Sequence, residues 1–247
     1  MIFSRSQPEV DGPPRLKRVL VYGDSISWGW APQTTFIPSE RLPETEQWPR
    51  VMAAALGGEY EIVVDALSGR TTDAADPLAP QFPGVGLDGN AALPAVLGAH
   101  LPLDLVVLML GSNDQKPQFF RSPFRIALGA GRLIDTVKRS ANLYGTLWLT
   151  NPAPQVLLVC PPPFGKLVKG ARTMFGGNDE RIGGLAAAYA HIAAAAGVPF
   201  FDAGTVVTSD GVDGVHLTSA SQRRLGEAMA PLVRDLLGGP APPERPV

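Results

Sequence analysis

The chain has 247 residues, of which 45% are apolar and 18% charged, which is enough for one large α/β domain with a substantial core. Its net charge is −2, and its Lys, Arg, Asp and Glu residues are evenly scattered, so it offers neither a basic stripe for nucleic acid nor a polybasic membrane patch. A single cysteine, Cys160, excludes an intrachain disulfide and a multi-cysteine metal site. The composition favours small, weakly charged partners.

The two ends of the chain predict tails around one domain. Proline and polar residues indicate an N-terminal tail over 1–15 and a C-terminal tail over 239–247, which leaves a single domain over 16–238. The first residues lack an apolar stretch of signal-peptide length, so we expect a cytoplasmic protein. The alanine-rich tract over 185–201 contains Gly and Pro, which is typical of a buried helix followed by a strand rather than of a membrane span.

Short runs of valine and leucine predict strands that are buried on both faces. They lie at 18–22, 60–67, 103–110 and 155–160, with a fifth over 199–203. Helical segments are predicted over 47–56, 123–139, 179–196 and 219–237. In the last of these, Ser219 and Gln222 have the spacing of a capping box. The alternation predicts a parallel sheet covered by helices on both faces, with ligands bound beyond the carboxyl ends of the strands.

The first predicted strand runs into the segment GDSISWGW, which places Ser25 just beyond the carboxyl edge of the sheet. A serine hydroxyl is nearly inert at neutral pH until a base accepts its proton, so a nucleophilic role requires a nearby histidine. His100 precedes a strand, at the wrong edge of the sheet, and His191 lies in an alanine-rich helix. His216, between the fifth strand and the final helix, is the candidate base.

Asp213 stands three residues before His216, close enough for a turn to bring its carboxylate to the imidazole. Such a carboxylate would fix the ring tautomer and stabilise the imidazolium that forms during proton transfer. Asp210 and Asp202 are alternatives for this role. For the whole segment, the alternative interpretation is a polar Gly/Asp turn with an incidental histidine.

Two further strand ends carry candidate donors for the oxyanion of an acyl-transfer intermediate. The Gly69 amide follows the second predicted strand, and the side-chain amide of Asn113 follows the third. The backbone amide of Ser25 would be a third donor. Individually, Gly69 could be a loop glycine and Asn113 a turn or helix cap. Their joint occurrence with Ser25 and His216 favours acyl transfer.

These pieces resemble the four sequence blocks of the GDSL/SGNH hydrolase superfamily: GDS at 23–25, the glycine at 69, GSND at 111–114 and DGVH at 213–216. The resemblance implies a flavodoxin-like three-layer α/β/α sandwich with a five-stranded parallel sheet. It also implies that Ser25 is the nucleophile, that Asp213 and His216 complete the triad, and that Ser25, Gly69 and Asn113 form the oxyanion hole.

Longer strings, such as LSGRTTDAADP and LPLDLVVLMLGSND, resemble the arylesterase/acyltransferase subgroup. This implies a serine esterase for small aryl or alkyl esters that forms an acyl-enzyme on Ser25 and also passes the acyl group to alcohols. Members of the subgroup form octamers, so the resemblance implies a homo-oligomer. No cofactor or metal is predicted. A carbohydrate acetylesterase, a lipase or a thioesterase would use the same triad, and a non-catalytic binding protein is the alternative outside enzymes.

Apolar residues that adjoin the candidate catalytic positions are candidate walls of the ester pocket, with core packing as the alternative for each: Ile26, Trp28, Trp30 and Val215. The stretch 164–179 follows the fourth strand, so we expect it to overhang the site.

Overall fold

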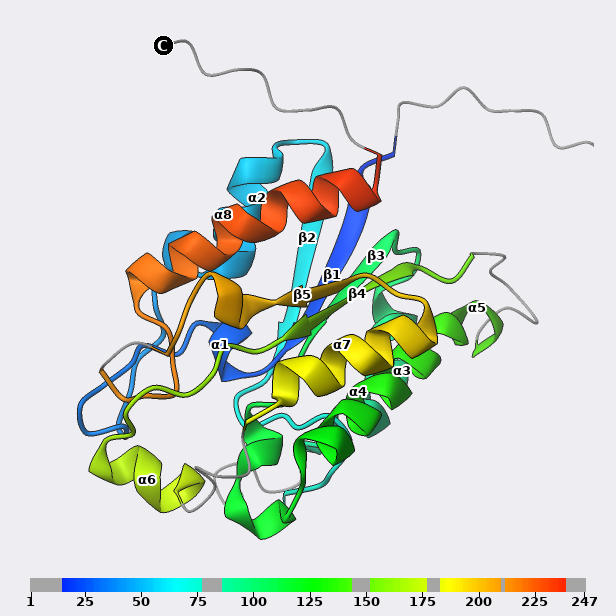
Figure 1. The fold of residues 1–247 in the computed structure, drawn as a ribbon. Helices are drawn as coiled ribbons and strands as arrows, with labels where there is room; N and C mark the ends of the chain where they lie inside the picture. The colour runs from blue at the N-terminus through cyan, green and yellow to red at the C-terminus, as the bar shows by residue number, and fades with distance from the viewer. Residues whose placement is uncertain (1–14, 77–85, 144–151, 177–182, 210–211, 239–247) are drawn as a thin grey trace, which may run out of the picture.

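The computed structural model describes residues 15–76, 86–143, 152–176, 183–209 and 212–238. Apart from Arg15, the predicted tails over 1–15 and 239–247 lie outside these described residues. Figure 1 shows one central sheet with helices on both of its faces, which is the three-layer α/β/α arrangement that the sequence predicts. Among the described residues, no helix is both long and apolar enough to cross a bilayer.

The sheet is parallel throughout, with the strand order β2-β1-β3-β4-β5. Its strands are β1 (Lys17–Gly23), β2 (Tyr60–Ala66), β3 (Leu105–Met109), β4 (Gln155–Cys160) and β5 (Phe200–Asp202). Each strand overlaps its predicted run. All carboxyl ends therefore meet at one edge, and the strand order reverses at β1 and β3, the position where open α/β sheets bind ligands.

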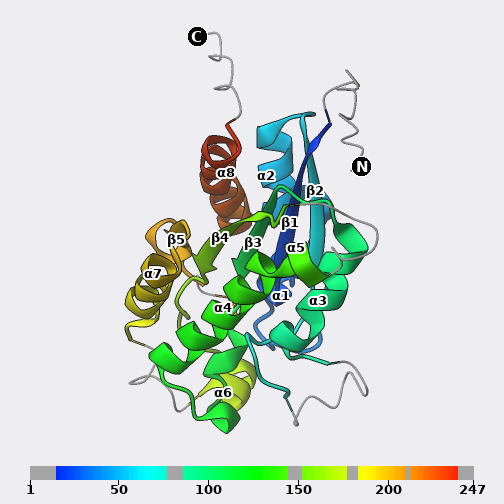
Figure 2. The same cartoon turned by 90° about the vertical axis from the view of Figure 1, so that its right-hand side faces the viewer.

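Helices cover both faces of the sheet (Figure 2), and an apolar layer on each face holds them against it. One face carries α2 (Trp48–Leu56) and α8 (Ser219–Leu236), and the other carries α3 (Gly89–His100), α4 (Pro123–Lys138) and α7 (Leu185–Ala196). Val19 and Val21 of β1 pack toward the first layer, while Leu20 and Tyr22 pack toward the second. This alternation follows from the period of two along a strand, and it explains why the strands read as continuous apolar runs.

Shorter helices complete the fold: α1 (Ser25–Trp28), α5 (Ser140–Leu143) and α6 (Lys169–Phe175). Helix α7 begins at Leu185, after Gly184 in a left-handed conformation, whereas the sequence predicts a start at 179. Residues 179–182 lie outside the described residues.

The capping box predicted for α8 is wrong. Thr218 is the N-cap, and its hydroxyl accepts a hydrogen bond from the Ser221 amide at 3.4 Å. The hydroxyl of Ser219 instead donates to Glu46 at 2.5 Å. The side chain of Gln222 accepts from the Trp48 amide at 2.9 Å and donates to the Ile26 carbonyl at 3.0 Å. Tertiary contacts to Glu46, α1 and α2 therefore use the two side chains that a capping box would need.

Candidate active site

Ser25 is held at the carboxyl edge of the sheet by a tight turn between β1 and α1. Asp24 is the N-cap of α1, and its carboxylate accepts a hydrogen bond from the Ile26 amide at 3.0 Å. A Cβ on Gly23 would lie 2.3 Å from the Ser27 hydroxyl oxygen, so this turn requires glycine at the end of the strand. Ser25 then begins the helix, next to the switch between β1 and β3.

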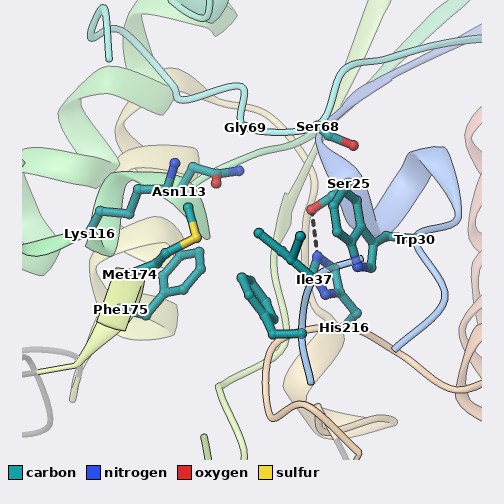
Figure 3. Close-up of a pocket in the computed structure, with 11 residues that line it drawn as sticks. Ser25, Trp30, Ile37, Ser68, Gly69, Asn113, Lys116, Met174, Phe175 and His216 are labelled. Carbon is teal, nitrogen blue, oxygen red and sulfur yellow. Dashed lines mark hydrogen bonds between the residues drawn. The ribbon is translucent and has the colours of Figure 1, made fainter. Parts of the chain in front are cut away.

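His216 reaches Ser25 from the other end of the chain, as Figure 3 shows. Its Nε2 lies 2.9 Å from the Ser25 Oγ, and its Nδ1 lies 2.8 Å from Oδ2 of Asp213. With the ring proton on Nδ1, the imidazole donates to Asp213 and its Nε2 is free to accept the serine proton. This arrangement can activate the hydroxyl for attack on a carbonyl carbon.

Asp213 is an ionised carboxylate in a buried position. Its side chain is 0% exposed, and its Oδ1 accepts from the backbone amides of Val215 and His216, each at 2.8 Å. Burial alone would raise the pKa of Asp213, but the hydrogen bonds from the His216 ring and from these amides outweigh it and hold that pKa below its usual range. Asp213 can therefore keep its charge beside the imidazole.

The alternative residues lie elsewhere or outside the described part of the chain. Asp202 accepts from the Gly204 amide at 2.8 Å and so caps a short turn, and Asp210 is outside the described residues. His191 is exposed on α7, where its ring contacts Phe124. His100 ends α3, and its carbonyl accepts from Arg18 near the start of β1, at the opposite edge of the sheet.

Gly69 and Asn113 line the same pocket as Ser25 and His216. Gly69 has φ of +90°, a left-handed conformation that favours glycine. The Asn113 amide donates to the Arg70 carbonyl at 3.1 Å, which orients it at the pocket wall. The Arg70 side chain in turn donates to the carbonyls of Gly23 at 3.2 Å and Asp65 at 2.8 Å. The ends of β1 and β2 therefore position the loop that carries Gly69.

A cavity of about 320 Å³ opens beside Ser25 (Figure 3). Its walls are mostly apolar, and the apolar residues are Trp30, Phe36, Ile37, Met174 and Phe175. The rings of Trp30 and Phe36 stack on the His216 ring, with centroids 5.1 and 5.8 Å away. Besides the candidate triad and the candidate oxyanion donors, two polar residues also line it: Ser68 and Lys116. The cavity is large enough for a small ester. The two stacked aromatic rings shield the imidazole.

Of the four predicted wall residues, Trp30 lines the cavity and the other three do not. Ile26 and Val215 are each 1% exposed and belong to separate core clusters, so these two predictions are wrong. Trp28 does not line the cavity either, and its ring lies against the Arg41 guanidinium, 4.9 Å from its centroid. Ile26 directly follows Ser25 on α1 and projects about 100° away from it around the helix axis, so adjacency in sequence does not place it in the pocket.

The predicted overhang over 164–179 is confirmed within its described part, because Met174 and Phe175 of α6 form a wall of the cavity. The sequence reasoning missed Phe36, Ile37, Ser68 and Lys116. Ile37 is an apolar residue that is 59% exposed, in a loop whose sequence has no periodicity. The positions of Ser68, next to Gly69, and of Lys116, three residues after Asn113, were the available signals.

A model of the GDSL-like lipase/acylhydrolase family matches residues 21–224. The chain belongs to this family. An aryl esterase structure from M. smegmatis is 44% identical, with a TM-score of 0.82, over 90% of this chain and 100% of that one. A carbohydrate acetylesterase from Sinorhizobium meliloti is 41% identical, with a TM-score of 0.82, over 89% and 99% of the two chains. No curated protein sequence matched. This GDSL-family chain thus has the SGNH hydrolase fold and is an ester-hydrolysing enzyme.

Proposed function

We propose that this enzyme hydrolyses small aryl or alkyl carboxylic esters through an acyl-enzyme on Ser25. The observation that carries the proposal is the continuous contact from Asp213 through His216 to Ser25, at 2.8 and 2.9 Å, beside an apolar cavity. His216 takes the Ser25 proton as Oγ attacks the ester carbonyl carbon, and it returns that proton to the departing alcohol. A second acceptor, activated by the same imidazole, then releases the acyl group and restores the serine.

The negative charge that develops on the carbonyl oxygen needs donors on the opposite side of the cavity from the imidazole. We propose the backbone amides of Ser25 and Gly69 and the side-chain amide of Asn113 for this role. Each such donor is worth about 3 kcal/mol of transition-state stabilisation in a water-poor site. The support for this role is that all three residues line one cavity and that Gly69 presents no side chain.

Replacement of the nucleophile tests the function directly. Ser25→Ala should lower kcat/KM for an aryl acetate by about 10⁶-fold, because the members of a triad act as a unit. Ser27→Ala is the matched control, since it removes a buried hydroxyl from the same short helix. Steady-state hydrolysis assays measure kcat/KM for both variants and for the parent. Activity of Ser25→Ala within tenfold of the parent would end the proposal, and a phosphonate probe that fails to label Ser25 would favour a non-catalytic binding protein.

We also propose that the acyl-enzyme is released by alcohols as well as by water. The apolar walls formed by Trp30, Phe36 and Ile37 support this, because they favour an apolar acceptor over water near the imidazole. The test uses vinyl acetate as acyl donor in buffer with increasing concentrations of benzyl alcohol. The fraction of the product that is benzyl acetate rather than acetate should rise with the alcohol concentration and then saturate. Acetate as the sole product at every alcohol concentration would contradict transfer.

Deacetylation of carbohydrates is a second candidate, because a relative with 41% identity is described as a carbohydrate acetylesterase. The same residues would perform it, so the chemistry of the triad does not distinguish the two. The two functions are distinguished by comparing kcat/KM for acetylated sugars with kcat/KM for phenyl acetate. A higher value for the sugars would identify a carbohydrate acetylesterase, and a higher value for phenyl acetate would identify an arylesterase.

A further inference from the structure

Lys116, which lines the cavity on the side away from His216, belongs to a buried ion pair. The Lys116 ammonium donates to Oδ2 of Asp76 at 2.9 Å, and the two side chains are 3% and 1% exposed. Lys116 itself lines the cavity, whereas the neighbouring wall residues Met174 and Phe175 are apolar. A buried ion pair contributes little net stability, because removal of both charges from water costs about as much as their attraction returns. Its presence at this position calls for a role other than folding.

Among the described residues, the Lys116 ammonium has donors to spare. An ammonium carries three N–H donors. Within the part of the chain that the structure describes, the Lys116 ammonium donates a hydrogen bond to the Asp76 carboxylate. A further neighbour is the Phe175 ring, whose centroid lies 5.9 Å from Nζ. Asp76 also accepts from Gln118 at 3.3 and 3.5 Å, so Lys116 is not the only donor to its carboxylate.

The position of Lys116 points to the acyl side of the substrate. The leaving oxygen must face His216, which protonates it, so the acyl chain has to extend away from the imidazole. Figure 3 shows His216 and Trp30 on one side of the cavity and Lys116, Met174 and Phe175 on the other, with Asn113 between Lys116 and Ser25. An acyl chain that runs past Asn113 therefore meets the Lys116 side chain on an otherwise apolar wall.

On the basis of the proposed esterase function, we propose that Lys116 selects esters whose acyl chain carries a neutral oxygen acceptor, such as an ether or hydroxyl oxygen, over hydrocarbon chains of equal length. A neutral acceptor can take a spare N–H of the ammonium without displacing Asp76. A carboxylate would bring a second negative charge next to the 1% exposed Asp76 carboxylate in an apolar cavity, which is unfavourable. The expected substrate class is thus alkoxyacyl and hydroxyacyl esters.

Matched pairs of p-nitrophenyl esters test this preference. Methoxyacetyl is compared with butyryl, and methoxypropanoyl with pentanoyl, so that within each pair one CH₂ is replaced by oxygen. The measured quantity is kcat/KM for the ether-containing ester divided by kcat/KM for the hydrocarbon ester of the same pair. This ratio is compared between the parent and Lys116→Met, because the comparison cancels the intrinsic reactivity of each ester. In at least one pair the ratio should fall by about tenfold in Lys116→Met, the usual loss for a hydrogen bond to a charged donor.

Lys116→Met leaves a buried Asp76 without its cation, so the double variant Lys116→Met/Asp76→Asn is assayed beside it. The neutral double variant should show the same tenfold fall. If Lys116 has only a structural role, both members of each pair will lose activity together and the ratios will stay within twofold of the parent, which overturns the inference. If the parent hydrolyses none of the esters, the proposed esterase function itself has failed.

Discussion

Asp114 connects the two loops that carry the proposed oxyanion donors. It directly follows Asn113, and its carboxylate accepts from the backbone amide of Thr72 at 2.9 Å and from the Thr72 hydroxyl at 2.6 Å. Thr72 lies three residues after Gly69. The guanidinium of Arg121 donates to the same carboxylate at 2.9 Å and also binds Asp73. The side chain of Asp114 is 0% exposed, so this connection is shielded from water.

Burial raises the pKa of Asp114 to about 6, although the hydrogen bonds from Thr72 and the charge of Arg121 oppose the rise, and Asp73 adds to it. The folded protein therefore binds this proton more tightly than the unfolded chain does. The free energy of unfolding should rise as the pH falls through 6, and the gain from about pH 7 to about pH 5 is about 1 kcal/mol from this group. Asp114→Asn should lack that gain.

Denaturant unfolding of the parent and of Asp114→Asn at the two pH values measures the difference. Asp235→Asn, which removes an exposed carboxylate from α8, controls for the loss of one negative charge. A parent whose stability changes with pH in parallel with Asp114→Asn would contradict the prediction.

Among the elements, the strands were the most predictable. Runs such as QVLLVC coincide with β4, since a central parallel strand is covered on both faces and therefore carries apolar residues throughout. The parallel sheet then brings Ser25, Gly69 and Asn113 to one edge, because each follows the carboxyl end of a different strand. The positions of the strand ends are therefore sufficient to predict that these residues meet, and the paths of the loops are not needed.

The elements and contacts that were missed depend on information that is not local. Helix α3 begins at Gly89, contains Pro94 and has little contrast between its faces, so its pattern does not stand out. Gln222 looks like part of a cap until α1 and α2 are packed against it. Phe36 and Ile37 enter the cavity because of the course of an irregular loop, for which no periodic signal exists in the sequence.

At the scale of the whole molecule, the site depends on a long return of the chain across the sheet edge. The segment after β5, at one end of the strand order, carries His216 back to Ser25, which follows the central strand β1. Gly214 in this segment has φ of +82°, and a Cβ there would lie 2.5 Å from the Lys166 carbonyl oxygen. The amide of Gly165 donates to the Gly214 carbonyl at 2.9 Å. The loop after β4 thus supports the segment that carries His216, which ties the proposed base to the fold as a whole.

The resemblance to the arylesterase/acyltransferase subgroup predicts self-association, and exposed apolar side chains are available for it. Phe120 is 79% exposed and Phe124 50%, while Ile37 is both 59% exposed and part of the cavity. Light scattering should therefore give a mass that is a multiple of 26.1 kDa.

Phe120→Asn should shift the mass toward the monomer, and asparagine tolerates the φ of +47° at this position. Leu16→Asn is the control, because Leu16 is 45% exposed next to the start of β1, at the opposite edge of the sheet. A parent that scatters as a 26.1 kDa particle at every concentration would contradict the prediction.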